Sequence, residues 1–221
     1  CAFVMELPQI TENIKGNSMA LMVGGVRAYN QENLYSRKSP EKFKILIGFK
    51  NMVCTNLCIS TVGFADQVRV ISVNLFADEV EKLLTGYDRE MHLRRMEIMS
   101  QVKLSEPQFA HFIGKLRMYQ HIEKAEQDLL PMQLNDGQIN TVVKNYYKDP
   151  NFKRSADGSI DLWRLYNLFT EANKSSYIDN NFDRNVNAYE ITNNLVNSLK
   201  NQSYNWFLHN YFYCVYTRWK L

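Results

Sequence analysis

The chain has 221 residues, of which 45% are hydrophobic and 22% charged, and it contains five prolines. This composition is that of an ordinary globular protein and excludes the disordered and fibrous classes. Its formal net charge of +3 lies far below the strongly basic balance that is typical of nucleic-acid-binding modules. A role in nucleic-acid binding therefore has to rest on local clustering of basic residues.

The four cysteines do not form the dense pattern of a secreted disulfide scaffold, so we expect a cytoplasmic protein with reduced thiols. The sequence contains no apolar run of about eighteen residues, the length that a membrane span needs, and we expect no membrane partner. The first letters, CAFVMELPQI, lack an initiator methionine and the basic leader of a signal peptide. The strand pattern is present from the first residues, which predicts that the chain is the C-terminal portion of a longer protein.

Extended patterns come first along the chain. Residues 2–7 and 20–29 are apolar runs, and each run predicts a strand. The first run closes at Pro8. The second contains Gly24-Gly25, a pair that marks a bulge or a close approach of two backbones.

Two further strands are expected after these. Residues 43–60 place apolar residues at alternate positions, which predicts a half-buried strand that is interrupted if Lys50-Asn51 forms a turn. Residues 67–73 are a candidate for the fourth strand because Val68 and Val70 share one face of an extended chain.

From Asn74 onward apolar residues recur at steps of three and four, the period of an amphipathic helix. The start signals are polar caps: Ser105 with Gln108 forms the pattern of a capping box, and Asn135 or Asp136 opens a later helix. The residue before Pro150 disfavours helical angles and ends that helix. Helices are predicted over residues 74–99, 105–119, 135–149, 159–172 and 183–200.

Strands followed by helices predict an α+β fold, because alternating units would be needed for a parallel sheet. We expect a mostly antiparallel sheet over about residues 2–73 and a helical C-terminal half over about residues 74–201. Residues 1–208 are expected to form a single domain. Residues 209–221 are an acid-free aromatic tail that forms an edge strand, binds a partner, or does not belong to the domain.

Cys54 and Cys58 look at first like metal ligands, because CTNLC places two thiols four positions apart. Zinc needs two more ligands, and neither a second cysteine pair nor a closely spaced histidine pair accompanies them. On an extended chain the two thiols share one face. We therefore expect small buried thiols and no metal.

Residues 153–164, KRSADGSIDLWR, imitate part of a calcium-binding loop. Aligned on Gly158, the first and twelfth ligand positions hold Lys153 and Arg164, where calcium requires oxygen ligands. The segment instead predicts a turn at Asp157-Gly158, followed by Ser159 or Asp161 capping a buried helix.

The motifs that carry strong catalytic content are absent from the sequence, including the glycine-rich phosphate loops, the zinc-binding helix HExxH and the nucleophile elbow GxSxG. The histidines are scattered singly, and the acidic pairs fall at helix starts, where they favour the helix dipole. The sequence therefore predicts no cofactor and no catalytic residue, and we expect a non-enzymatic protein. An enzyme with dispersed site residues stays open as a third reading.

Basic residues cluster around the second and third predicted strands, against only Glu32 and Glu41. Several cations within reach of one backbone suit phosphate binding, and aromatic faces suit unpaired bases. A solvated surface loop is the competing interpretation. The candidate nucleic-acid-binding residues are Arg27, Tyr29, Tyr35, Arg37, Lys38, Lys42 and Lys44.

The sequence around these basic residues, together with several later segments, resembles a known family. The segments GGVRAYNQENLYSRKSPEKFKILIGFKNMVCTNLCIS, FAHFIGKLRMYQ, INTVVKNYYKD, DLWRLYNLFTEANKSSYID and NAYEITNNL resemble the family of domain of unknown function 3871. More distantly, VCTN and LYNLFTE are similar to phage- and plasmid-like proteins of the domain of unknown function 932 group. The tail after Leu208 departs from the family's pattern.

The resemblance implies a setting on conjugative and other mobile elements of bacteria, but it transfers no catalytic residue. Together with the basic cluster it leads us to expect a nucleic-acid-binding accessory factor with DNA or single-stranded nucleic acid as partner. The alternative is a protein-interaction or assembly module that binds other mobile-element proteins.

Overall fold

The computed structural model describes residues 2–27, 42–53, 56–69, 73–121 and 134–200. The chain divides into two compact units, Cys1–Arg94 with Ser176–Val186 and Arg95–Ser175 with Asn187–Leu221. We call the first the sheet unit and the second the helical unit, and we describe each by itself.

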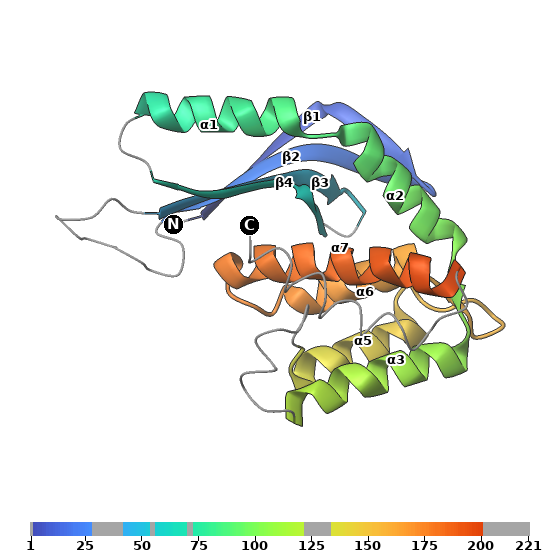
Figure 1. The fold of residues 1–221 in the computed structure, drawn as a ribbon. Helices are drawn as coiled ribbons and strands as arrows, with labels where there is room; N and C mark the ends of the chain where they lie inside the picture. The colour runs from blue at the N-terminus through green and yellow to red at the C-terminus, as the bar shows by residue number, and fades with distance from the viewer. Residues whose placement is uncertain (1, 28–41, 54–55, 70–72, 122–133, 201–221) are drawn as a thin grey trace. The chain divides into compact units, whose positions relative to one another are not determined.

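The sheet unit is built on a four-stranded antiparallel meander in the order β1-β2-β3-β4 (Figure 1). Its strands are β1 (Ala2–Ile14), β2 (Asn17–Arg27), β3 (Lys42–Asn51) and β4 (Leu57–Arg69). Every strand pairs with its neighbour in the chain, so no crossover connection is needed. The predicted antiparallel sheet is confirmed.

The boundaries of the strands correct three predictions. β1 continues past Pro8, because the register shifts between Leu7 and Thr11 and a bulge accommodates a residue that has no N–H to donate. The single strand predicted over residues 43–60 is divided, because β3 ends at Asn51 and β4 begins at Leu57; Lys50-Asn51 still belong to β3, and the turn follows them. The fourth strand is β4, which reaches only to Arg69; a separate strand over residues 67–73 was the wrong expectation.

A tight hairpin joins β1 to β2. Lys15 and Gly16 both have positive φ, 49° and 80°, between the paired residues Ile14 and Asn17. Positive φ at both central residues is the signature of a type I′ turn, whose twist matches that of the flanking strands. Gly16 at the second position therefore fixes the register of the hairpin.

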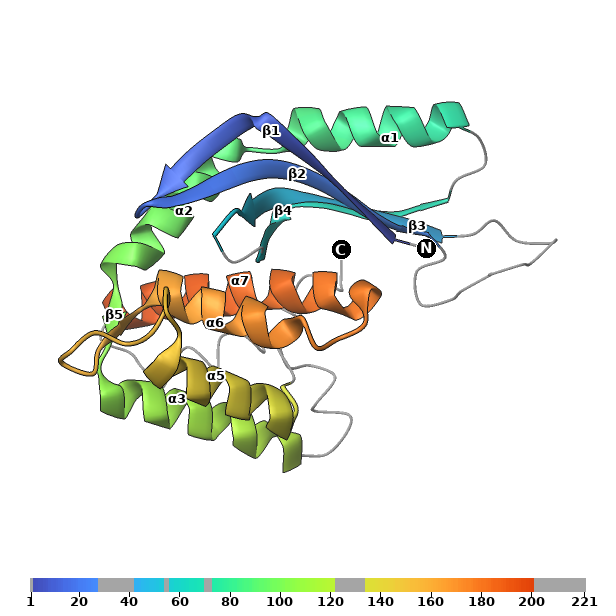
Figure 2. The same cartoon turned by 180° about the vertical axis from the view of Figure 1, so that it is seen from behind.

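Each face of the sheet buries apolar side chains. On one face a cluster joins the strands to the first turns of α7 (Ile178–Lys200) and consists of Met22, Val26, Leu46, Ile59, Phe182 and Val186. On the other face Phe49 is fully buried and its ring lies 6.5 Å from Tyr87 and 5.6 Å from His92. Helix α1 (Val73–Gly86) lies along β3 and β4 (Figure 2).

Helix α2 (Arg89–Gln101) begins where the predicted long helix over residues 74–99 breaks. The break has a local cause, because the Asp88 carboxylate accepts a hydrogen bond from the Met91 N–H at 2.8 Å and so caps the new helix. Tyr87 then places its hydroxyl 2.6 Å from Nδ1 of the buried His92.

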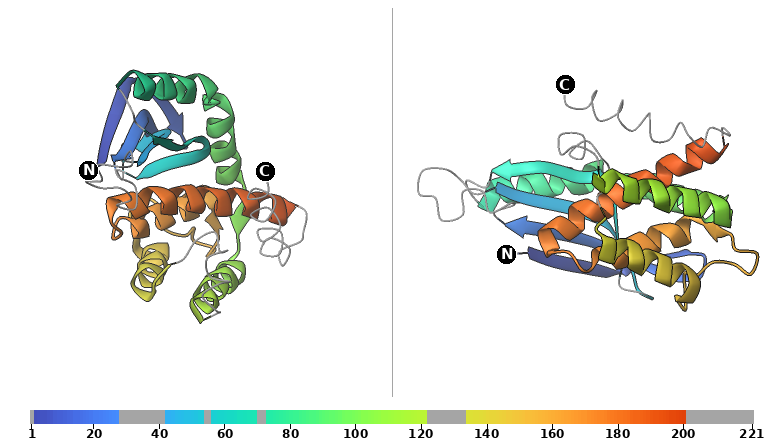
Figure 3. Two further views of the ribbon diagram at one scale, coloured as in Figure 1. Left: turned by 60° about the vertical axis from the view of Figure 1, so that its left-hand side comes forward. Right: turned by 90° about the horizontal axis from the view of Figure 1, so that it is seen from below.

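The helical unit contains helices α3 (Glu106–Met118), α5 (Asp136–Lys148) and α6 (Leu162–Asn173), the 3₁₀ turn η2 (Tyr119–His121) and the remainder of α7 (Figure 3). A short antiparallel pair, β5 (Lys103–Leu104) with β6 (Ile160–Asp161), joins the entrance of α3 to that of α6. The predicted helical C-terminal half is confirmed.

The predicted caps hold these helices. The Ser105 N–H donates to Oε1 of Gln108 at 2.8 Å, and Asn135 forms a complete capping box with Gln138. Asp161 caps α6, which begins at Leu162 and not at the predicted Ser159. Helix α7 begins at Ile178, before the predicted Asp183.

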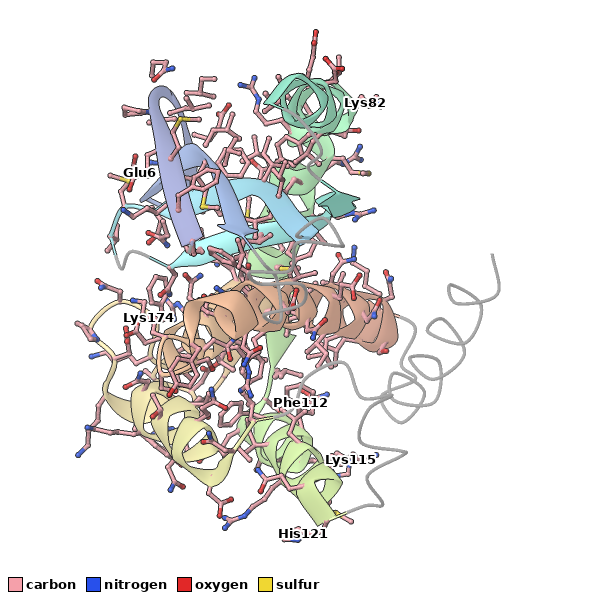
Figure 4. The ribbon with its side chains drawn as sticks, turned by 90° about the vertical axis from the view of Figure 1, so that its left-hand side faces the viewer. Glu6, Lys82, Phe112, Lys115, His121 and Lys174 are labelled. Carbon is pink, nitrogen blue, oxygen red and sulfur yellow. The ribbon has the colours of Figure 1, made fainter. Side chains whose placement is uncertain are left out.

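The interior of the helical unit is rich in aromatic rings. Phe112 points from α3 into the unit, and its ring lies 6.0 Å from that of Phe169 on α6 (Figure 4). Trp163 and Tyr166 of α6 are also buried, as the apolar residues on most sides of this helix predict. None of the described helices combines the length and the apolar character that crossing a bilayer requires.

Candidate functional site

The predicted basic cluster falls at one end of the sheet. β2 ends at Arg27 and β3 begins at Lys42, with Val26 paired to Lys44 and Arg27 paired to Phe43. The register therefore brings the backbones of Arg27, Lys42 and Lys44 together at this end. The other predicted residues, Tyr29, Tyr35, Arg37 and Lys38, lie in the connecting residues 28–41, outside the described part of the chain.

Arg69 joins this end of the sheet, and the sequence reasoning missed it. It is the last residue of β4 and is paired in register with Lys42. Two like charges at directly opposed positions of an antiparallel pair are unfavourable. Only the pairing of β3 with β4 places Arg69 at this end of the sheet, and the sequence near Arg69 does not predict that pairing.

We call the end of the sheet at which Arg27, Lys42, Lys44 and Arg69 lie the basic sheet end. Buried residues hold the strands in place next to it. Val26 of β2 is 4% exposed, and Ile45 and Leu46 of β3 are fully buried. Because these anchors lie within one to four residues of Arg27, Lys42 and Lys44, the strands present those positions on a fixed backbone. A preorganised backbone reduces the entropy that binding would otherwise cost.

A second feature is a groove in the helical unit. Helices α3 and α5 run antiparallel and line a cavity of about 600 Å³. At one end the Tyr147 hydroxyl lies 3.5 Å from Oε1 of Glu106, and at the other Arg117 lies 3.7 Å from Asp136. We call this feature the α3–α5 groove.

The floor of the groove is apolar and tightly packed. The Tyr146 ring stacks on Phe109 with a centroid distance of 4.1 Å, and its hydroxyl donates to the carbonyl of Gly158. Burial raises the pKa of Tyr146, and the nearby Glu106 carboxylate adds to the shift while Arg154 opposes it. A phenol held neutral by burial and hydrogen-bonded to the backbone is a structural group and a poor general base.

Charges at the mouth of the groove pair with one another. The Arg154 guanidinium lies 3.3 Å from Oε2 of Glu106 and 4.9 Å from the centre of the Tyr147 ring. These groups suit recognition of a side chain or a planar group. The described residues that line the groove include no cysteine, serine or histidine.

The structure describes part of the two segments that the sequence analysis compared with metal sites. Cys58 is fully buried in β4, as expected for a core thiol, whereas Cys54 lies outside the described residues. Gly158 has φ 81°, which confirms the turn at Asp157-Gly158. Within the described ranges, no group of three or more histidine, cysteine, aspartate or glutamate residues is placed to hold a metal ion.

The Asp157 carboxylate is occupied by this turn. It accepts hydrogen bonds from the Ser159 N–H at 3.0 Å and from the Ser159 hydroxyl at 2.7 Å. These bonds, with that from the hydroxyl the largest cause, hold the pKa of Asp157 below its usual value. The carboxylate therefore stabilises the turn that precedes α6.

Comparison with known proteins gives one family. The family described as "Domain of unknown function, B. Theta Gene description (DUF3871)" matches residues 1–208. No curated protein matches the chain, and no solved structure matches it.

Proposed function

The chain belongs to this family of unknown function, DUF3871, and from that premise we propose that it is a non-enzymatic nucleic-acid-binding accessory protein of a bacterial mobile element, acting in the cytoplasm. The observation that supports the proposal is the basic sheet end. Four positions on three consecutive strands, Arg27, Lys42, Lys44 and Arg69, meet where residues 28–41 join β2 to β3.

The chemistry of the connecting residues fits the same partner. The sequence of residues 28–41 contains two cations, Arg37 and Lys38, and two aromatic residues, Tyr29 and Tyr35. Cations that lie close together bind successive phosphates, and aromatic rings stack on unpaired bases. Single-stranded DNA or RNA offers both groups at once, so we propose single-stranded nucleic acid as the preferred partner.

The like-charged pair at Lys42 and Arg69 supports the proposal independently. The register places two basic residues at opposed backbone positions; like charges at such positions disfavour an unbound antiparallel pair in general, and an anionic ligand offsets that cost. An anionic ligand gives a reason for both positions to be basic.

The test is fluorescence anisotropy with labelled single- and double-stranded oligonucleotides over a series of salt concentrations. The double variant Lys42→Ala/Lys44→Ala is expected to weaken binding by roughly tenfold at low salt, and each lost phosphate contact is expected to reduce the salt slope by about 0.7 for single strands. Arg37→Ala/Lys38→Ala is expected to act in the same way.

The matched control is Lys144→Ala/Lys148→Ala, which removes the same charge from exposed positions of α5 in the helical unit. It is expected to leave binding nearly unchanged. Absence of binding at low salt, or equal losses in the sheet-end and control variants, would contradict the proposal, because charge alone would then explain any affinity.

A second candidate function is a protein-interaction or assembly module, and the α3–α5 groove is the observation that favours it. The groove combines buried apolar residues with Tyr147, which is 48% exposed, and such tyrosines are typical of interfaces. Affinity purification of the chain with the other proteins of its element tests this candidate. A partner that is retained by the wild type and lost in Tyr147→Ala would support it, and recovery of no partner would count against it.

A further inference from the structure

The α3–α5 groove repeats its apolar residues once per helical turn on both of the helices that form it. Its floor consists of Phe109 and Ile113 from α3 and Ile139, Val143 and Tyr146 from α5. On each helix these positions are three or four residues apart, so they lie one above the other on the same face. A guest in the groove therefore meets apolar sites about 5.4 Å apart, the rise of one helical turn.

The geometry of the groove suits a helix better than an extended chain. Between their ends, the backbone donors and acceptors of α3 and α5 are used within the helices, so the groove offers none to an extended peptide. A helix satisfies its own backbone. From Glu106 to Arg117 the groove is about 16 Å long, at a rise of about 1.5 Å per residue, which gives room for about three turns of a guest helix.

The α3 side of the groove permits a close approach. Ala110 and Gly114 lie there four residues apart, and both are exposed. A Cβ atom added at Gly114 would meet no atom within 4 Å. The distance between packed helices depends on the size of the side chains at their contact, so a guest helix can lie directly against α3.

The charges around the groove indicate the chemistry of that helix. Glu106 lies 3.3 Å from the Arg154 guanidinium, and Asp136 lies 3.7 Å from Arg117, so each carboxylate has a cation beside it. Lys144 lines the α5 side of the groove, is exposed, and forms no ion pair with a described residue. An acidic side chain of the guest helix is the group that complements Lys144.

We propose that the α3–α5 groove binds an amphipathic helix of a partner protein, with the apolar face of that helix on the floor and an acidic residue beside Lys144. The proposal goes beyond nucleic-acid binding and rests on the second candidate function, whose partner it specifies. Residues 209–221 of the chain itself contain Arg218 and Lys220 but no acidic side chain, so they lack this complement.

The first experiment uses two labelled helix-forming peptides of about fifteen residues, a length at which isolated helices begin to form. Both carry leucine at every third or fourth position, and the flanking positions hold glutamate in one peptide and lysine in the other. In fluorescence anisotropy the wild type is expected to bind the glutamate peptide at least about tenfold more tightly than the lysine peptide. NMR is expected to show shifts of the Ile113, Ile139 and Val143 methyl groups.

Lys144→Glu is expected to reduce the preference for the glutamate peptide at least about threefold, because an attraction becomes a repulsion. The matched control is Lys148→Glu, which makes the same change on α5 at an exposed residue that does not line the groove. Gly114→Leu fills the groove and is expected to weaken binding of the glutamate peptide at least about tenfold. Circular dichroism checks that the three variants fold.

A wild type that binds neither peptide, or both equally, overturns the proposal. The first of these results is the one that a groove filled by another part of the protein would give. An unchanged preference in Lys144→Glu, an equal loss of preference in Lys144→Glu and Lys148→Glu, or full binding by Gly114→Leu overturns the assignment to the groove.

Affinity purification separates this proposal from the second candidate function. The expected result is a partner that the wild type and Lys148→Glu retain and that both Tyr147→Ala and Lys144→Glu lose. A partner that Tyr147→Ala loses and Lys144→Glu retains in full would leave the interaction function standing and overturn the acidic helix.

Discussion

Gly48 of the sheet unit and Gly114 of the helical unit have opposite surroundings, although both units bury an apolar interior. In the sheet unit a Cβ atom added at Gly48 would lie 2.3 Å from the carbonyl oxygen of Cys58 and 2.9 Å from Cα of Ile59. In the helical unit a Cβ atom added at Gly114 would meet no atom within 4 Å. The close approach of β3 and β4 therefore leaves no room for a side chain at Gly48, whereas α3 has room for one at Gly114.

The same contrast extends to the sources of stability. The helical unit relies on stacked rings and on caps such as Asn135, which can be changed one at a time. The sheet unit relies on the register of consecutive strands, in which one displaced backbone moves several side chains. Residues of the sheet unit are thus expected to tolerate less change. The four predictions below test this comparison, beginning with the largest effect.

Gly48→Ala is expected to lower the free energy of unfolding by about 3 kcal/mol or more, because the new methyl group collides with the backbone of β4. Backbone atoms cannot rotate away as side chains do. Urea unfolding followed by circular dichroism measures the change. A loss below about 1 kcal/mol would mean that β3 and β4 separate easily at this point, and the comparison would fail.

Tyr146→Phe is expected to cost about 1–2 kcal/mol at neutral pH, because the carbonyl of Gly158 loses its buried donor. Thermal unfolding of both proteins at several pH values measures it. Burial raises the folded-state pKa of Tyr146. The contribution of its neutral hydroxyl to the free energy of unfolding is therefore complete below the unfolded pKa of about 10, and it declines as the pH rises through the folded-state pKa. The difference between the two proteins should therefore shrink in alkali. A constant difference across this range would show that the pKa is not raised.

Gly114→Ala is expected to stabilise the protein by about 0.5–1 kcal/mol, because alanine restricts the unfolded chain and favours the helix. The same substitution thus has opposite signs in the two units, and urea unfolding under the conditions used for Gly48→Ala provides the direct comparison. Destabilisation at Gly114 would indicate that the α3–α5 groove is occupied at that position.

Ser159→Ala is expected to raise the pKa of Asp157 toward its usual value, because the main hydrogen bond to the carboxylate is lost. In the wild type, the ionised carboxylate stabilises the folded state at pH values above its unfolded-state pKa. This stabilisation is lost as the pH falls through the lower pKa of the folded state. Titration of the Asp157 carboxyl carbon by NMR measures the shift. Identical titration curves would assign the depression to the backbone bond alone.

Local signals were sufficient where the cause of a structure is local. The caps at Ser105 and Asn135 were predicted because the capping residue and its partner lie three positions apart. Pro8 misled the strand assignment because a bulge, formed with β2, decides whether a proline is tolerated. Helical periodicity was sufficient for α3, α5 and α6, and it did not locate the cap at Asp88.

The candidate site also shows that local signals are predicted from the sequence, whereas features that depend on distant segments are not. Arg27, Lys42 and Lys44 were found because basic residues are close in the sequence on either side of residues 28–41. Arg69 was missed because it reaches this end only through the pairing of β3 with β4. The α3–α5 groove was missed for a related reason, since a cavity is a property of two helices and neither helix carries its pattern alone.

The turn at Lys15-Gly16 has a consequence for the order of folding. It separates β1 from β2 by two residues, whereas β2 and β3 are joined through residues 28–41. Closing the shorter connection costs less chain entropy and brings together contacts of low sequence separation. The β1–β2 hairpin is therefore expected to form first and the β3–β4 pair, which is joined through residues 52–56, next, whereas the pairing of β2 with β3 is expected to form last.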